Sequence, residues 1–232
     1  KAFQPSYEKI VELKPQVVIA YASMGAGLEI AEKLEPTGIK VVLLDSYKPE
    51  TYDSDLKVLG KMFGKEKEAN AFLKWKTEQI ATLDKVKNLK KEQRVNVFSM
   101  NTGDFEKEKW STFASGTPAH QAIEMAGGIN VARELKDYPD ISPEWILQHN
   151  PEVLVFRDFN SDLLGFKTND YTNAKNFTEK VIKSNVLSKT GAVQKDRMYI
   201  IIGDILGGDK SYLGALYLAK WFYPDLFKDL DP

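Results

Sequence analysis

Several side chains suited to ligand binding share one position in the sequence, at the end of a short apolar run or just after it. They are Tyr21, Ser23, Tyr47, Arg157 and Asp204. Ligands of open α/β sheets bind beyond the carboxyl ends of parallel strands, so these residues lie at a ligand site if the apolar runs are strands. The tyrosine rings offer flat, amphipathic walls for a chelate or macrocycle. Arg157 offers a permanent cation for an anionic metal complex or an oxyanion.

Side chains that would carry catalysis or bind a bare metal ion are scarce. The chain has no cysteine and only two histidines, His120 and His149, and it lacks the usual zinc-protease and serine-hydrolase motifs. We therefore predict no catalytic residue, no metal ion held by protein ligands and no bound cofactor. Gly25 and Gly27 match only part of a dinucleotide-binding fingerprint, because Ile30 stands where the third glycine is required.

The bulk composition argues against two kinds of partner. The 232 residues carry a formal net charge of −1 without a basic stripe, so nucleic acid is not expected as a partner. No apolar run approaches the roughly 20 residues that a helix needs to cross a bilayer. With 43% hydrophobic residues, the chain is long enough to bury one large core or two smaller ones.

One phrase of sequence occurs twice. SYEKIVELKPQVVIA at 6–20 aligns without a gap to SPEWILQHNPEVLVF at 142–156, at an offset of 136 residues. Both copies start on serine, which is a good helix N-cap, and both lead through a helical stretch to a proline and an apolar strand. The sequence predicts the same helix–proline–strand unit at two places. Chance similarity is the alternative, because this unit is common in α/β proteins.

Strand and helix patterns alternate on both sides of one long helical stretch, which predicts parallel sheets covered by helices. Residues 66–89 contain neither proline nor glycine, and at about 1.5 Å per residue they would form a helix about 36 Å long. Such a helix is long enough to connect two lobes. Residues 158–176 are polar and predict a surface loop. The expected strands are 17–21, 41–44, 94–100, 153–156 and 198–202, and the other expected helices are 7–13, 28–34, 51–63, 117–125, 143–149, 177–184 and 212–222.

The repeated phrase resembles a signature of the iron–siderophore, haem and cobalamin substrate-binding proteins of ABC importers. Later phrases resemble the C-lobe of the same family, in the family's order: EMAGGINVARE, ISPEWILQHNPEVLVF, AVQKDRMYII and ALYLAKWFYPDLF. The resemblance implies an α/β fold of two Rossmann-like lobes joined by one long α-helix, with the ligand cleft between the lobes. The expected parts are an N-terminal lobe at 1–63 lacking its first strand–helix segment, a connecting helix at 64–91 and a C-terminal lobe at 92–232.

The resemblance also implies roles for particular residues. In WSTFASGTPAH, the residues Trp110, Ser115 and Thr117 match a ligand-side loop before a helix. Glu8 and Glu144 occupy the same place in the two repeat copies, and in the family an acidic residue there docks into arginine pockets of the permease dimer. The alternative for both glutamates is a local role, because acids in the first turn of a helix interact favourably with the helix dipole.

The expected function is therefore that of an extracytoplasmic, periplasmic or lipid-anchored, solute-binding protein and not of an enzyme. It would act as a monomer, bind an iron(III)–siderophore or related metal chelate and deliver it to an ABC importer permease. Membrane contact would come only through the permease or an N-terminal lipid. Two alternatives stay open: an oxyanion such as molybdate or tungstate as the ligand, and a two-lobed α/β transferase that uses Asp45 and Asp204.

Overall fold

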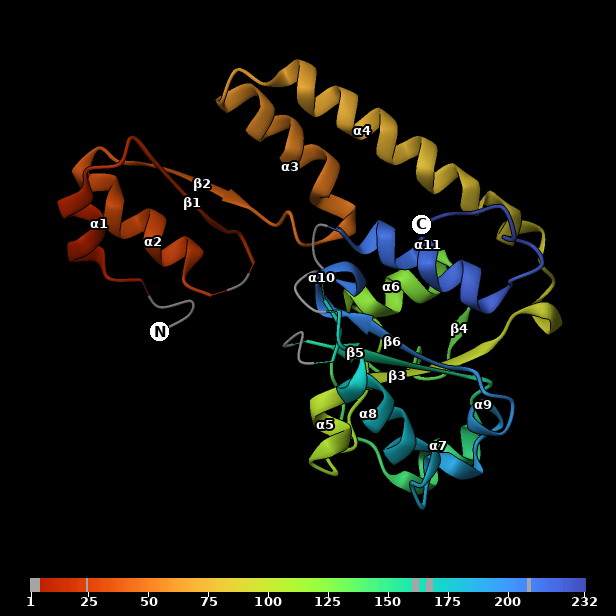
Figure 1. Ribbon diagram of the computed structural model, residues 1–232. Coiled ribbons are helices and arrows are strands. Elements are labelled where there is room, and N and C mark those ends of the chain that lie inside the picture. Colours follow the sequence, from red (N-terminus) through yellow and green to blue (C-terminus); the bar gives the residue numbers. More distant parts are fainter. Residues whose placement is uncertain (1–4, 24, 160–162, 166–168, 208–209) are drawn as a thin grey trace. The chain divides into compact units, whose positions relative to one another are not determined.

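A computed structural model describes residues 5–23, 25–159, 163–165, 169–207 and 210–232, and the structural statements below concern these residues (Figure 1). The chain forms two compact units, residues 1–71 and 72–232, which are described separately. Among the helices of the described residues, none is both long enough and apolar enough to cross a membrane.

The first unit contains a two-stranded parallel sheet with helices around it. Strands β1 and β2 pair so that Tyr21 lies opposite Leu44 at their carboxyl ends. Helix α2 is amphipathic and buries Ile30 and Leu34. The elements are α1 (Tyr7–Leu13), β1 (Val17–Tyr21), α2 (Gly27–Leu34), the 3-10 helix η1 (Glu35–Thr37), β2 (Lys40–Leu44) and α3 (Pro49–Met62), followed by α4 (Glu66–Ala81), which continues into the second unit.

The second unit is built on a four-stranded parallel sheet in the order β4-β3-β5-β6. Helices cover both faces of this sheet (Figure 1). After α4 the elements are η2 (Thr82–Asn88), η3 (Lys91–Gln93), β3 (Asn96–Asn101), α5 (Thr102–Glu106), α6 (Pro118–Met125), β4 (Ile129–Asn130), α7 (Pro143–His149), β5 (Val153–Asp158), α8 (Thr172–Ile182), η4 (Leu187–Lys189), α9 (Gly191–Gln194), β6 (Met198–Ile202), α10 (Gly203–Leu206) and α11 (Ser211–Phe222).

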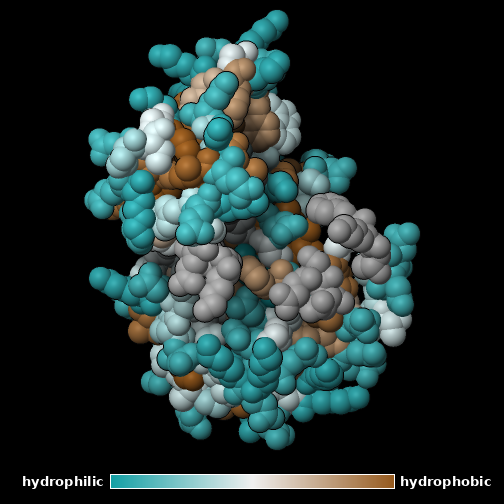
Figure 2. Space-filling model, turned by 90° about the vertical axis from the view of Figure 1, so that its left-hand side faces the viewer, coloured by the Kyte–Doolittle hydropathy of each residue, from teal (hydrophilic) through white to brown (hydrophobic). Residues whose placement is uncertain are grey.

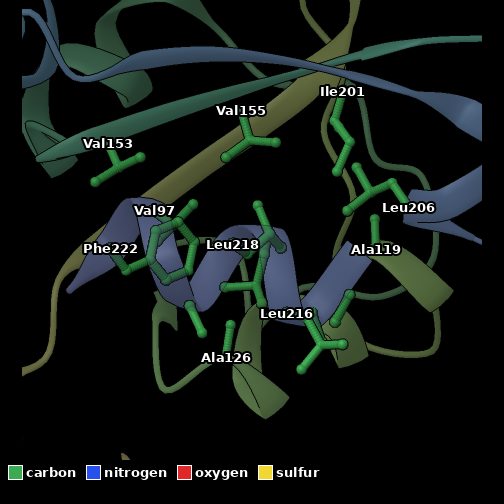
Figure 3. Close-up of a cluster of buried hydrophobic side chains, with 14 of the residues drawn as sticks. Val97, Ala119, Ala126, Val153, Val155, Ile201, Leu206, Leu216, Leu218 and Phe222 are labelled. Atoms are coloured by element: carbon green, nitrogen blue, oxygen red, sulfur yellow. The ribbon is translucent and has the colours of Figure 1, made fainter. Parts of the chain in front are cut away.

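The central strand β5 divides its side chains between two cores. Val153 and Val155 point to the core formed with α6 and α11, which Figure 3 shows, while Leu154 and Phe156 point to the core formed with α7, α8 and α9. Successive side chains of a strand face opposite ways, so a continuous apolar run fills both layers. Full burial of one such side chain contributes about 1.5–3 kcal/mol, which fixes the position of the strand.

The repeated phrase folds as the repeated unit that the sequence predicts. Helices α1 and α7 are each 7 residues long, and the N-caps Ser6 and Ser142 accept hydrogen bonds from the backbone N–H three residues later. Both helices end at a left-handed residue, Lys14 and Asn150. Each then leads through proline into a strand, β1 or β5. The two copies therefore match in their capping geometry as well as in sequence.

The long helical stretch differs from the prediction. Residues 66–81 are α-helical, but 82–88 form the 3-10 helix η2. The boundary between the two compact units falls inside α4. In a 3-10 helix, residues three apart lie on the same side, which places Leu83 and Val86 together. Both are buried in the core of the second unit, so their burial accounts for the tighter turn.

Two further expectations need correction. The predicted loop 158–176 is wrong at both ends, because β5 extends to Asp158 and α8 already begins at Thr172. Residues 160–162 and 166–168 of that loop lie outside the described residues. The short elements α5, β4, α9 and α10 were not expected, because segments of 5, 2, 4 and 4 residues are too short to show a period in the sequence.

Tyr223 provides a test of the packing in the second unit. Its hydroxyl donates to the carbonyl of Gly127 at 2.7 Å and accepts from the N–H of Val95 at 3.2 Å. Tyr223→Phe removes both hydrogen bonds from a half-buried site, so we expect the free energy of unfolding to fall by about 1–3 kcal/mol in urea denaturation. Tyr171→Phe, at an exposed position, is the control. Equal stability of the two variants would contradict this account.

Candidate ligand site

The first unit gathers three predicted residues at the carboxyl ends of β1 and β2. The rings of Tyr21 and Tyr47 meet edge to face with centroids 5.3 Å apart. The hydroxyls of Ser23 and Tyr47 lie 3.2 Å apart, and Lys48 Nζ donates to Ser23 Oγ at 2.5 Å. The parallel pairing of the strands brings these residues together, as the sequence predicts. Lys48 was not predicted, although it stands next to Tyr47.

Asp45 organises this cluster from a buried position. Its carboxylate accepts from the backbone N–H groups of Ala22 and Ser23 at 3.0 and 3.1 Å and from Lys48 Nζ at 2.9 Å. Burial alone would raise the pKa of Asp45, but the hydrogen bonds from Ser23 and Lys48 outweigh burial and lower the pKa to about 2. The carboxylate is therefore ionised at neutral pH, and it fixes the turn after β1 against the turn after β2.

In the second unit, Arg157 occupies the carboxyl end of β5 between Asn101 of β3 and Ile201 of β6. The Cζ atom of Arg157 lies 4.8 Å from the ring centroid of Phe159 and 5.8 Å from that of Phe113. Burial lowers the pKa of Arg157, while Tyr138 and Asp204 act in the opposite direction. The guanidinium still carries its charge at neutral pH, because arginine side chains stay protonated in proteins.

The environment of Arg157 contains two rings that are not predicted from the sequence. Phe113 lies inside the quoted WSTFASGTPAH phrase, and Phe159 follows Arg157 by two residues. A cation–π contact depends on how separate segments come together, so spacing alone did not reveal either ring. Asp204 lies exposed in the first turn of α10, where its charge acts on Arg157.

Two of the predicted residues have local partners. Thr117 is the buried N-cap of α6: its hydroxyl accepts from the N–H of His120 and donates to the carbonyl of Ala114. Ser115 Oγ donates to the carbonyl of Leu135. Both hydroxyls therefore hold the loop that carries Phe113, and their role in ligand binding stays a prediction.

Trp110 lies at a different place on the second unit. It packs edge to face on Phe105, with centroids 6.2 Å apart, and lines a cavity of about 530 Å³ beside the end of α8. A smaller cavity of about 190 Å³ includes Asn101 and Phe159 at the carboxyl end of the sheet. Of the two, only the smaller cavity adjoins the strand ends where a ligand is expected.

Glu8 and Glu144 occupy equivalent positions. Each is exposed, and each is the second residue of its helix, two positions after the N-cap serine. The structure fits both the docking role and the local interaction with the helix dipole. On the face drawn in Figure 2, polar side chains predominate and apolar groups show between them.

Among the described residues, no group of three or more histidine, aspartate or glutamate side chains is placed to bind a metal ion. In the second unit, the cation Arg157 suits a ligand group that brings its own oxygen atoms. Such a ligand is an oxyanion or a metal ion already wrapped by a chelator. In the first unit, taken by itself, the hydroxyls of Tyr47 and Ser23 can also bond to polar groups.

A comparison with known families decides the class of protein. Residues 2–204 match the family described as "Periplasmic binding protein". The chain belongs to this family. The match extends over parts of both units, and it confirms the resemblance stated from the repeated phrase and from the C-lobe phrases that lie before residue 204. Periplasmic binding proteins bind solutes, so the expectation that the chain is not an enzyme is also confirmed, and the transferase alternative finds no support.

Two curated relatives carry names that state a ligand. The chain is 29% identical to the Fe(3+) dicitrate-binding periplasmic protein FecB of Escherichia coli over 69% of its own length and 54% of that protein. It is 30% identical to the iron(3+)-hydroxamate-binding protein FhuD of Bacillus subtilis over 43% of its own length and 30% of that protein. The aligned part thus spans about half of the first relative and a third of the second.

The fold is also found among solved structures. The TroA-like periplasmic binding protein FepB from Veillonella parvula matches with a TM-score of 0.83 at 24% identity, over 98% of this chain and 68% of that one. At this identity the similarity concerns the fold alone. It confirms the predicted α/β class with parallel sheets.

The charge of Asp45 should make the stability of the first unit depend on pH. Its pKa is lowered from 3.8 to about 2 in the folded state, so the carboxylate stabilises the fold above about pH 4, and this contribution is lost as the pH falls towards 2. Asp45→Asn should cost roughly 2 kcal/mol at pH 7 and much less at pH 2.5, measured by chemical denaturation.

The control is Glu32→Gln, which removes an exposed carboxylate from α2 in the same unit. We expect its effect to be within about 0.5 kcal/mol at both pH values. A loss for Asp45→Asn that is the same at pH 7 and pH 2.5 would rule out the charge as the cause.

Proposed function

We propose that this chain is the extracytoplasmic solute-binding protein of an ABC importer and that it captures an iron(III)–siderophore or a related metal chelate. Family membership supports the binding role. The names of the two curated relatives, which state iron(III) dicitrate and iron(III) hydroxamate, favour an iron chelate. Capture outside the cytoplasm followed by delivery to the permease is the role that such a protein serves.

The observation that carries this proposal is the position of Arg157. Its guanidinium lies at the carboxyl end of the central strand of a parallel sheet, where α/β proteins bind ligands. Two aromatic rings have their centroids 5.8 and 4.8 Å from its Cζ atom, those of the buried Phe113 and the exposed Phe159. A fixed cation beside exposed apolar surface suits an anionic chelate, which offers oxygen atoms to the guanidinium and carbon surface to the rings.

The edge-to-face pair of Tyr21 and Tyr47 supports the same class of ligand from the first unit. Both hydroxyls of the Ser23–Tyr47 contact can exchange hydrogen-bond partners with a polar ligand. An oxyanion such as molybdate or tungstate is the second candidate, because Arg157 alone would satisfy it. The aromatic rings favour the larger chelates, since a small inorganic anion makes no use of apolar walls.

A thermal-shift screen of the purified chain tests this function. Ferric dicitrate, a ferric trihydroxamate, haem, cobalamin and molybdate are each added in excess, and we expect a ferric chelate to raise the melting temperature most. A ligand at 100 times its Kd stabilises the folded state by about 2.7 kcal/mol. Arg157→Gln should weaken binding of ferric dicitrate at least about tenfold in titration calorimetry, because it removes the charge.

Stabilisation by molybdate alone would favour the oxyanion. If none of the five compounds raises the melting temperature, the proposed function is wrong. Arg133→Gln is the matched control for the arginine substitution, because Arg133 is exposed and pairs with Glu134. This control should bind the chelate as the unaltered chain does.

We further propose that Glu8 and Glu144 dock the protein, as a monomer, onto arginines of the permease dimer. Their equivalent, exposed positions at the second residue of α1 and α7 support this role. Two like charges from repeated units suit a partner with two equivalent cationic pockets. Charge-assisted contacts between arginine and carboxylate determine orientation and association rate more than affinity. A lipid at the N-terminus is the other expected link to the membrane.

The docking proposal predicts a separation of binding from transport. In the double variant Glu8→Gln and Glu144→Gln, ligand affinity should stay unchanged while uptake of radioactive iron chelate by cells that carry the importer falls about tenfold or more. Glu32→Gln combined with Glu134→Gln removes two exposed carboxylates elsewhere and serves as the control. Normal uptake by the docking variant would leave only the local helix-dipole role for these glutamates.

A further inference from the structure

The space around the Arg157 guanidinium is bounded by two glycines. A Cβ atom at Gly207 would lie 3.3 Å from Arg157 Nη2 and 3.7 Å from its Cζ. A Cβ atom at Gly203 would lie 3.2 Å from Arg157 Nε and 3.1 Å from the Cα of Phe159. These distances are shorter than or close to ordinary van der Waals contact. Either side chain would therefore displace the guanidinium or its neighbours.

The backbone at Gly207 does not explain why glycine stands there. Its φ of −153° and ψ of 173° are extended values that any residue adopts. Besides Arg157, the nearest atom to an added Cβ is the Cβ of Pro118 at 3.7 Å, which is an ordinary contact. The missing side chain thus matters at Gly207 because of the guanidinium and not because of the turn.

Most N–H donors of the guanidinium held there make no hydrogen bond to the described residues. Within the described part of the chain, it makes one hydrogen bond, a long one of 3.4 Å from Nη2 to the carbonyl of Gly203, and Nε is buried without a partner. Arginine has five N–H donors, and leaving a buried one unused costs free energy. Packing against Phe113 and Phe159 and the two glycines, more than hydrogen bonding, therefore sets its position.

We propose that Gly203 and Gly207 are positioning residues: the space that they leave holds the Arg157 guanidinium ready for a carboxylate of the ligand. This arrangement selects anionic, carboxylate-bearing iron chelates over neutral ones. This inference rests on the proposed function and deepens it. A planar guanidinium fork matches the two oxygens of a carboxylate only when its orientation is fixed, so a shift of a few tenths of an ångström lowers affinity for that group. A neutral chelate loses little from the same shift.

The test uses Gly207→Ala in the full chain, with ferric dicitrate as the anionic probe and a neutral ferric trihydroxamate as the second probe. We expect Gly207→Ala to weaken ferric dicitrate binding about tenfold and trihydroxamate binding less than about twofold in titration calorimetry. In the background of Arg157→Gln, adding Gly207→Ala should cause no further loss, because the two changes act through one group.

Gly191→Ala is the control, since the nearest atoms to a Cβ there are 3.6 Å away, an ordinary contact, and belong to Asn150 and Pro151. It should leave both affinities unchanged. Equal losses of both probes in Gly207→Ala would show a general structural effect and overturn the proposal. So would a loss that adds to that of Arg157→Gln.

A second measurement needs no ligand. The ¹⁵N–¹H resonance of Arg157 Nε, assigned by its disappearance in Arg157→Gln, should shift in Gly207→Ala and stay in place in Gly191→Ala. If neither ferric probe binds the unaltered chain, the proposed capture of an iron–siderophore fails, and this resonance still decides whether Gly207 positions the guanidinium. An unchanged resonance in Gly207→Ala would overturn the inference.

Discussion

Parallel pairing is the constraint on which the candidate site depends. Every strand pair that the structure describes is parallel, in the two-stranded sheet of the first unit and in the four-stranded sheet of the second. The carboxyl ends of paired strands therefore meet at one edge of each sheet, and the residues that follow them become neighbours. Tyr21 and Tyr47 are 26 positions apart in the sequence, yet their rings touch for this reason.

The same constraint explains why polar side chains gather at that edge. A parallel sheet covered on both faces has no solvated side, so the side chains of Val153–Phe156 in β5 all lie in one or the other of two apolar cores. A charge inside either core would cost several kcal/mol unless it were fully paired. Arg157 and Asp158 accordingly come at the end of the strand, where Arg157 is only partly buried and Asp158 accepts hydrogen bonds from Leu163 and Leu164.

How much of the fold the sequence predicts depends on whether its signals are local. The bounds of α7 are predicted correctly because Ser142 caps the helix and Pro143 occupies its first turn, and both signals lie within the segment. The switch from α4 to η2 depends on where Leu83 and Val86 meet the rest of the core, which no local pattern records. For the site, the predicted strand ends correctly located Tyr21, Tyr47 and Arg157 at the carboxyl ends of the sheets. Phe113 and Phe159 were found only from tertiary contacts.

Asp45 of the first unit and Arg157 of the second differ in how far their hydrogen-bonding groups are paired, and this contrast indicates where a ligand is needed. Asp45 is saturated by two backbone N–H groups and by Lys48, so it needs nothing from outside and serves to hold two turns together. Arg157 has a single long hydrogen bond and a buried Nε without a partner. A saturated buried charge is a structural element, whereas an arginine held by rings and glycines with its donors unused has the form of a receptor for an anion. Anion binding in the second unit should therefore depend on Arg157 and on what fixes it, whereas Asp45 acts indirectly, by holding Ser23 and Lys48 of the first unit in place.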